Sequence, residues 1–112
     1  MTPVQLTEKY LELRLANKVP ELLALCAETI EVQTTKPYVG TTVIKGKFGV
    51  EGYLMANPGE GTWEPVQELS DDTTRVNGRI EYAQGDLVFN AEATFTTANG
   101  LITKVVVNFT VL

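Results

Sequence analysis

The amino-acid sequence predicts an α+β domain, with one bent antiparallel sheet and helices laid across one of its faces. The first half of the chain contains stretches with apolar residues at helical spacing, whereas the second half reads as four consecutive strands. The dipeptide Asn99-Gly100 marks a tight hairpin before the final strand. Helices that cross one face of a bent sheet enclose a space, so we expect a cavity between the two layers.

Length and composition limit the class of protein. The 112 residues fit a single domain, 1–112, and 44% hydrophobic with 21% charged residues indicates neither disorder nor a membrane span. A net charge of −5 would repel a phosphate backbone, so neither nucleic acid nor a membrane is an expected partner. The single cysteine, and an N-terminus that does not read as a signal peptide, favour a cytoplasmic protein.

The first helix has a clear start signal. Thr2 can cap it, Pro3 suits its first turn, and Gln5 completes a Thr-x-x-Gln capping box. We expect this helix to run to about Asn17. Apolar residues, Tyr10 among them, cover more than half of its circumference, so the helix should lie between other elements.

A second, shorter helix is predicted with Pro20 near its start. It should contain Leu22, Leu23, Leu25 and Cys26. Cys26 then reads as a small core residue, because the electropositive neighbours that would make a thiol reactive are not evident.

The middle of the chain reads as strand, loop and helix. Residues 30–34 alternate between apolar and polar and predict a short strand. Residues 35–45 contain Pro37 and Gly40 and are expected to form a loop. Residues 47–56 then have apolar residues at helical spacing and predict a third helix.

Three more strands are expected before the hairpin signal. Residues 63–69 are interrupted by Pro65, which suits the edge of a sheet. Residues 75–82 alternate, and a turn at Gln84-Gly85-Asp86 leads into the next strand. In that strand one face carries Leu87, Phe89, Ala91, Ala93 and Phe95, and the other carries Asn90, Glu92, Thr94 and Thr96.

The last strand, residues 101–112, is apolar on both faces. One face carries Leu101, Val105, Val107, Phe109 and Val111, and the other carries Ile102, Val106 and Leu112. A strand of this kind needs cover on both sides. The helices cover one side, and a second subunit is the simplest cover for the other, so we expect a homodimer.

Several segments resemble the cone-shaped α+β superfamily of nuclear transport factor 2 (NTF2) and ketosteroid isomerase, which includes SnoaL-like polyketide cyclases. They are Tyr10-Leu11-Glu12-Leu13, the Leu-rich stretch 22–27, Ile30-Glu31-Val32, GKFGVEGYL at 46–54, and FTTANGLI at 95–102. The likeness extends over nearly the whole chain. It implies a strongly curved sheet wrapped around the long first helix, a cone with an internal apolar cavity, and dimerisation through the sheet.

The resemblance also implies candidate catalytic positions. In ketosteroid isomerases a tyrosine and a protonated carboxyl form the oxyanion hole, and an aspartate moves the proton. The matching positions here are Tyr10, Glu92 and Thr34 respectively. A threonine hydroxyl is no base near neutral pH, which argues against isomerase chemistry. Glu92 reaches the cavity only if the polar face of its strand looks inward; if the face with Phe89 looks inward, Glu92 looks out.

Further candidates for the wall of a ligand-binding cavity are Tyr53, Trp63, Phe89 and Asn108. Aromatic side chains on apolar stripes more often pack in a core, so the implied cone is the reason to place them around a ligand. The chain has no histidine, and Asp71-Asp72 reads as a solvated turn. We therefore expect no metal ion or other cofactor.

Two function classes remain open at this point. The first is a small-molecule site, either an isomerase- or cyclase-type enzyme or a simple binder, that surrounds an apolar ligand. The second is a non-catalytic dimerisation or protein-interaction module whose cone is filled by its own side chains. An open cavity favours the first class, whereas a filled cone with an apolar outer sheet face favours the second.

Overall fold

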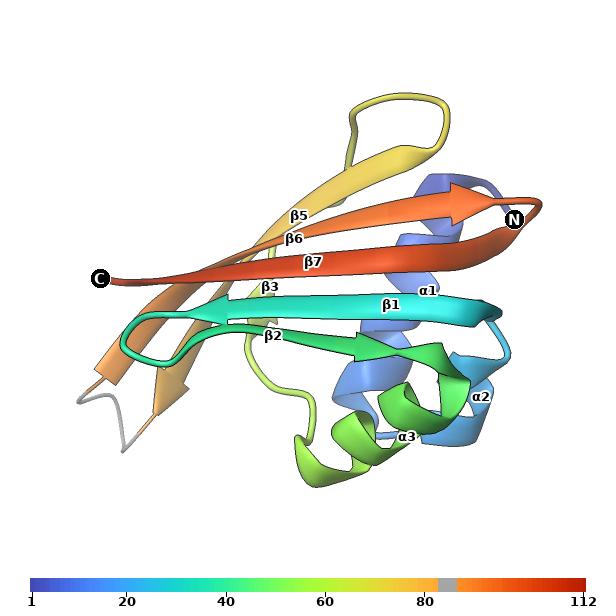
Figure 1. The fold of residues 1–112 in the computed structure, drawn as a ribbon. Coiled ribbons are helices and arrows are strands. Elements are labelled where there is room, and N and C mark those ends of the chain that lie inside the picture. Colours follow the sequence, from blue (N-terminus) through green and yellow to red (C-terminus); the bar gives the residue numbers. More distant parts are fainter. Residues whose placement is uncertain (83–86) are drawn as a thin grey trace.

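A computed structural model describes residues 1–82 and 87–112, and in it three helices cover one face of a curved seven-stranded sheet (Figure 1). This is the predicted α+β architecture. Within the described residues, no helix is both long enough and apolar enough to cross a bilayer. The predicted turn at 84–86 lies outside the described residues. The elements are α1 (Pro3–Leu15), α2 (Val19–Leu23), β1 (Cys26–Lys36), β2 (Gly40–Lys45), α3 (Gly46–Ala56), β3 (Thr62–Trp63), β4 (Gln67–Glu68), β5 (Thr73–Tyr82), β6 (Leu87–Ala98) and β7 (Leu101–Val111).

The strands are ordered β2-β1-β7-β6-β5-β3, and β4 also pairs with β5. All pairs are antiparallel except β1 and β7, which run parallel. The short strands β3 and β4 flank Pro65 at the sheet edge, as predicted. We call the helix-covered face of the sheet the inner face and the opposite one the outer face. The inner face carries Val32, Thr34, Phe95, Val105 and Val107, and the outer face carries Gln33, Thr94, Val106 and Asn108.

The predicted capping box starts α1. The Thr2 hydroxyl accepts a hydrogen bond from the Gln5 amide at 3.1 Å, and the Thr2 amide donates to the Gln5 side chain at 2.9 Å. The helix ends at Leu15, short of the expected Asn17, because Asn17 adopts a positive φ of 56°. The Asn17 side chain accepts from the Gly59 amide at 2.9 Å, which ties the end of α1 to the loop after α3.

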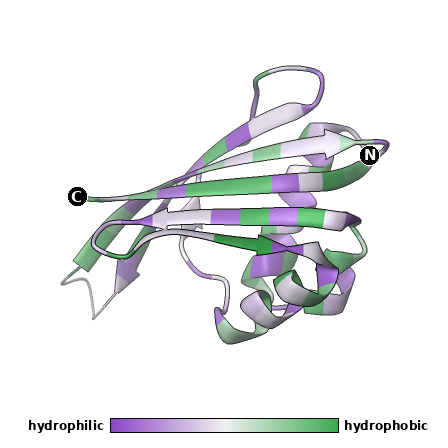
Figure 2. Ribbon diagram, viewed as in Figure 1, coloured by the Kyte–Doolittle hydropathy of each residue, from purple (hydrophilic) through white to green (hydrophobic). Residues whose placement is uncertain are grey.

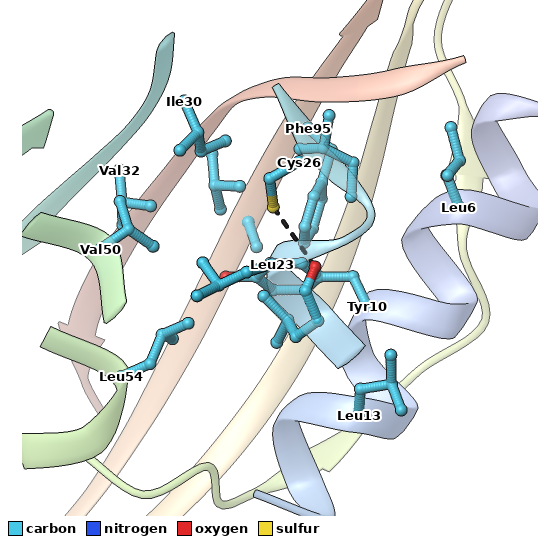
Figure 3. Close-up of a cluster of buried hydrophobic side chains, with 14 of the residues drawn as sticks. Leu6, Tyr10, Leu13, Leu23, Cys26, Ile30, Val32, Val50, Leu54 and Phe95 are labelled. Carbon is cyan, nitrogen blue, oxygen red and sulfur yellow. Dashed lines mark hydrogen bonds between the residues drawn. The ribbon is translucent and has the colours of Figure 1, made fainter. Parts of the chain in front are cut away.

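The core lies between α1, α3 and the inner face. Leu6, Tyr10 and Leu13 project from one side of α1 toward the sheet (Figure 3), and α3 adds Val50 and Leu54. Along β1 hydrophobic and hydrophilic residues alternate (Figure 2), as the sequence predicts for a sheet with one buried face.

The second helix is shorter than predicted. α2 ends at Leu23, and Cys26 begins β1 instead of lying in the helix. Pairing with β7 extends the strand at this point, since the Ile102 amide donates to the Leu25 carbonyl at 2.9 Å. The expected core role of Cys26 is confirmed: its thiol is buried, donates to the Leu22 carbonyl oxygen at 3.6 Å (Figure 3), and has a pKa raised to about 11 by burial.

Part of the predicted loop 35–45 is a strand. Tyr38 and Gly40 have positive φ angles of 67° and 95°, which turn the chain back on itself. The β-branched run Thr41-Thr42-Val43 then pairs with β1 as the edge strand β2. The loop prediction gave weight to Pro37 and Gly40 and overlooked this run.

A β-bulge changes the faces of β7. The β6–β7 register shifts between Thr96 and Thr97, which leaves Thr103 as an extra residue on β7. Ile102 therefore faces the core with 0% exposure, so its predicted place on the outer face is wrong. Leu101 is exposed, not part of the inner apolar row.

Candidate functional site

A pocket of about 420 Å³ lies between the helices and the inner face, and we call it the inner pocket. Its walls come from α1, α3, the loop after α3, and strands β1, β3, β5, β6 and β7. Its lining is mostly apolar and aromatic. The side chains used below are Tyr10, Arg14, Val32, Thr34, Lys36, Tyr53, Glu60, Trp63, Tyr82, Phe95, Val105, Val107 and Phe109.

The inner pocket has a deep end and a mouth, which follow from burial along two neighbouring strands. On β1 the inward residues run from Val32 and Thr34, 2% and 5% exposed, to the half-buried Lys36. On β7 they run in the same direction from Val105, 1% exposed, to the half-buried Phe109. The pocket therefore opens toward the carboxyl ends of β1 and β7.

Tyr10 brings a hydrogen-bond donor to the deep end. Its ring packs edge-to-face on Phe95 with centroids 5.0 Å apart. Burial raises the pKa of its hydroxyl far above the ordinary value, so the group stays protonated at neutral pH. The described residues give this hydroxyl no hydrogen-bond partner. Because they also contain no fully buried side-chain polar atom that lacks a partner, the Tyr10 oxygen keeps some accessible surface, and it faces the pocket that Tyr10 lines.

Thr34 supplies a second hydroxyl in the pocket wall that has no hydrogen-bond partner among the described residues. It lines the pocket at 5% exposure, and the described residues offer its side chain no hydrogen-bond partner. The other buried hydroxyls on α1 and β5 behave differently, because those of Thr7 and Thr74 bond to each other at 2.6 Å. Tyr10 and Thr34 thus give a largely apolar pocket two polar groups that are open to a ligand.

Trp63 forms part of the pocket wall above a glycine. A Cβ on Gly78, which pairs with Trp63 across β3 and β5, would lie 2.7 Å from indole carbon Cδ2. The indole Nε1 donates to the Glu60 carbonyl oxygen at 3.1 Å. Gly78 thereby lets the indole lie flat on the inner face, with its ring directed to the pocket.

Among the described residues, three charged side chains border the pocket. The Arg14 guanidinium lies 5.9 Å from the Tyr53 ring centroid, and the Lys36 ammonium lies 5.5 Å from that of Phe109. Glu60 is exposed, and Tyr82 has a pKa raised to about 12, first by burial and then by the nearby Glu60 carboxylate.

Comparison with known proteins identifies the fold. The sequence matches no protein-family profile and no curated protein. The structure is similar to an NTF2-like protein of unknown function from Cytophaga hutchinsonii, with a TM-score of 0.80 and 14% identity over 98% of this chain and 91% of that one. The chain has the NTF2-like fold.

Two further structures share the NTF2-like fold and were solved for steroid binders. One is a protein from Mycobacterium tuberculosis in complex with estradiol-17β-hemisuccinate, with TM-score 0.73, 19% identity and coverage of 96% and 93% of the two chains. The other is a computationally designed 17-OHP binder, with TM-score 0.67, 20% identity and coverage of 96% and 91%.

Four of the residues singled out from the sequence line the inner pocket of this NTF2-like domain: Tyr10, Thr34, Tyr53 and Trp63. Phe89 shares the inward side of β6 but is not part of the lining. It packs against Tyr82, with centroids 5.7 Å apart. Arg14, Lys36 and Phe109 line the pocket and were not predicted. Arg14 stands four residues after Tyr10, and Lys36 two residues after Thr34, so both could have been placed by helix and strand periodicity.

Glu92 and Asn108 do not belong to the inner pocket. They lie opposite each other on β6 and β7, are exposed, and border a depression of about 860 Å³ on the outer face. Their neighbours Ala93 and Val107 face inward, and successive strand residues alternate between faces. The predicted roles of Glu92 in an oxyanion hole and of Asn108 in ligand binding required a place in the same cavity as Tyr10, and the structure places both residues on the opposite face of the sheet.

Proposed function

We propose that this NTF2-like domain binds an apolar small molecule of steroid or polyketide size in the inner pocket. The observation that carries the proposal is the pair of hydroxyls, Tyr10 and Thr34, left without a described protein partner in a largely apolar pocket. Each can donate to a carbonyl or hydroxyl oxygen of a ligand. The two steroid-binding structures of the same fold support a ligand of this size.

The outer face favours this proposal over the interaction module. Its central rows are polar, with Asn77, Glu92 and Asn108 in register across three strands, and Arg79, Asn90 and Thr110 beside them. An interaction module with a filled cone would present an apolar outer face instead.

Ligand binding should stabilise the fold. We expect estrone, a neutral steroid with a ketone that Tyr10 can bind, to raise the melting temperature and to change Trp63 fluorescence. Tyr53→Ala should weaken both effects, because Tyr53 lines the pocket, whereas Glu31→Ala on the outer side of β1 should not. No thermal shift across a broad panel of apolar ligands would favour the interaction module.

Steroid isomerisation is not part of the proposed function. The general-base position holds Thr34, and Glu60 is the one carboxylate in the described lining, exposed and beside Tyr82. We expect the native protein to isomerise a Δ5-3-ketosteroid no faster than buffer.

Thr34→Asp should raise that rate by about a hundredfold, because it adds a base to the pocket that the Tyr10 donor also lines, and Thr34→Asn serves as the control without a base. An absorbance assay for the conjugated product measures all three proteins. Substantial native activity would contradict the assignment of Thr34.

Homodimerisation and a cytoplasmic location stay predictions from the sequence. With Ile102 buried, the apolar residues left for the predicted interface are the half-buried Val106 and the exposed Leu112. Light scattering should give a dimer mass, and Val106→Lys should shift it toward the monomer by placing a charge in the interface. A native protein that remains monomeric at high concentration would contradict the prediction.

A further inference from the structure

We infer that the ligand of the inner pocket is an amphipathic anion, with its apolar body against the inner face and a sulfate or carboxylate group beside Lys36 and Arg14. This inference rests on the proposed function and narrows it to a ligand class.

The first argument is the distribution of ion pairs. Of the nine basic residues, five pair with carboxylates among the described residues: Lys9, Lys45, Lys47, Arg79 and Lys104. No carboxylate among the described residues forms an ion pair with the other four: Arg14, Lys18, Lys36 and Arg75. Lys18 is exposed, and Arg75 donates to Gln67, whereas Arg14 and Lys36 both line the inner pocket.

The second argument is how these two side chains are held. Each is half-buried with its charge over an aromatic ring of the pocket wall, Arg14 on Tyr53 and Lys36 on Phe109. The face of an aromatic ring attracts a cation without accepting a conventional hydrogen bond from its N–H groups. These donors therefore remain available to bind an anion. Both cations thus occupy set positions on the wall rather than extending freely into solvent.

The third argument is the balance of charge. The chain carries a net charge of −5, so its overall field repels anions. The described pocket lining reverses this locally, because it contains the two cations Arg14 and Lys36 against one carboxylate, that of Glu60. A neutral ligand would gain little from this local reversal, whereas an anionic ligand would be attracted by it.

The orientation of the ligand follows from the burial along β1. Thr34 lies deep and Lys36 lies two residues nearer the mouth on the same side of the strand. The polar group bound by Tyr10 and Thr34 therefore belongs at one end of the ligand and the anionic group at the other. Estrone 3-sulfate has this form, with a ketone and a sulfate at opposite ends of a steroid.

The test compares estrone 3-sulfate with estrone by calorimetry at low salt. We expect the native protein to bind estrone 3-sulfate at least about fivefold more tightly than estrone. An affinity ratio of this size is typical of one partly exposed charge pair. High salt should reduce this ratio, because it screens exposed charges.

Variants locate the anion. Lys36→Met and Arg14→Met should each lower the ratio of the two affinities, and the double variant should bring that ratio close to one. Lys18→Met and Arg75→Met remove the same charge away from the pocket and should keep the native ratio.

The outcomes separate the two proposals. Equal binding of both steroids by the native protein would overturn the anionic ligand class and leave small-molecule binding standing. A sulfate preference that survives the double variant would also overturn it, since the anion would then be held elsewhere. If neither steroid nor any other apolar ligand binds, the proposed function fails and the inference fails with it.

Discussion

Phe95→Ala is expected to lower the free energy of unfolding by about 3–5 kcal/mol. Phe95 is 1% exposed, lies at the centre of the inner face, and packs edge-to-face on Tyr10. Its removal would open a void between α1 and the sheet that joins the inner pocket. Domains of this size are typically stable by about 5–15 kcal/mol, so the loss is a large fraction of the total. Urea denaturation followed by circular dichroism measures it.

Phe48→Ala is the matched control. The ring of Phe48 is 92% exposed, so its removal should change stability by no more than about 0.5 kcal/mol. Similar losses in the two variants would contradict the placement of Phe95 at the centre of the core.

Val107→Trp is expected to lower the affinity for a pocket ligand by more than about tenfold, or about 1.4 kcal/mol. Val107 is half-buried and lines the inner pocket, so the larger indole can enter the empty volume without displacing buried core side chains. The indole would then fill space in the inner pocket that the ligand needs. Calorimetry with estrone measures the affinity, and thermal unfolding confirms that the variant is folded.

Val106→Trp is the control on the adjacent residue. Val106 lies on the outer face, opposite Thr94 of β6, so an indole there leaves the inner pocket unchanged. We expect the native affinity. If both variants lose affinity equally, or if neither does, the ligand is not bound in the inner pocket.

Local signals in the sequence predicted much of the fold. The capping box at Thr2 and Gln5 is formed, and Asn99 and Gly100 both adopt positive φ angles, 54° and 75°, as a primed turn requires. Alternation along β5 and β6 separated the residues of the two faces of each strand, because side chains in a strand alternate between faces, but it left open which face of β6 looks into the cavity.

The errors arise where distant segments decide local structure. Cys26 leaves the predicted helix because β7 pairs with it, and that contact has no local signal. The bulge at Thr103 reverses the face of Ile102, and alternation alone cannot show an inserted residue. β2 was missed because its partner strand β1 lies across a turn that reads as loop.

The site was partly predictable for a similar reason. Tyr10, Tyr53 and Trp63 were named from the resemblance, and parity already indicated that Glu92 would look out if the apolar side of β6 looked in. Lys36 stayed hidden because the first strand was predicted to end at residue 34. Its role depends on the extension of β1 to Lys36.

The most direct measurement of ligand binding in the inner pocket is the set of nuclear Overhauser effects between estrone and the valine methyl groups of the labelled protein. Binding between the helices and the sheet predicts contacts from the steroid to Val32, Val105 and Val107, which line the inner pocket. Contacts to Val43 and Val106 on the outer face, or no contact to any valine of the inner face, would contradict it.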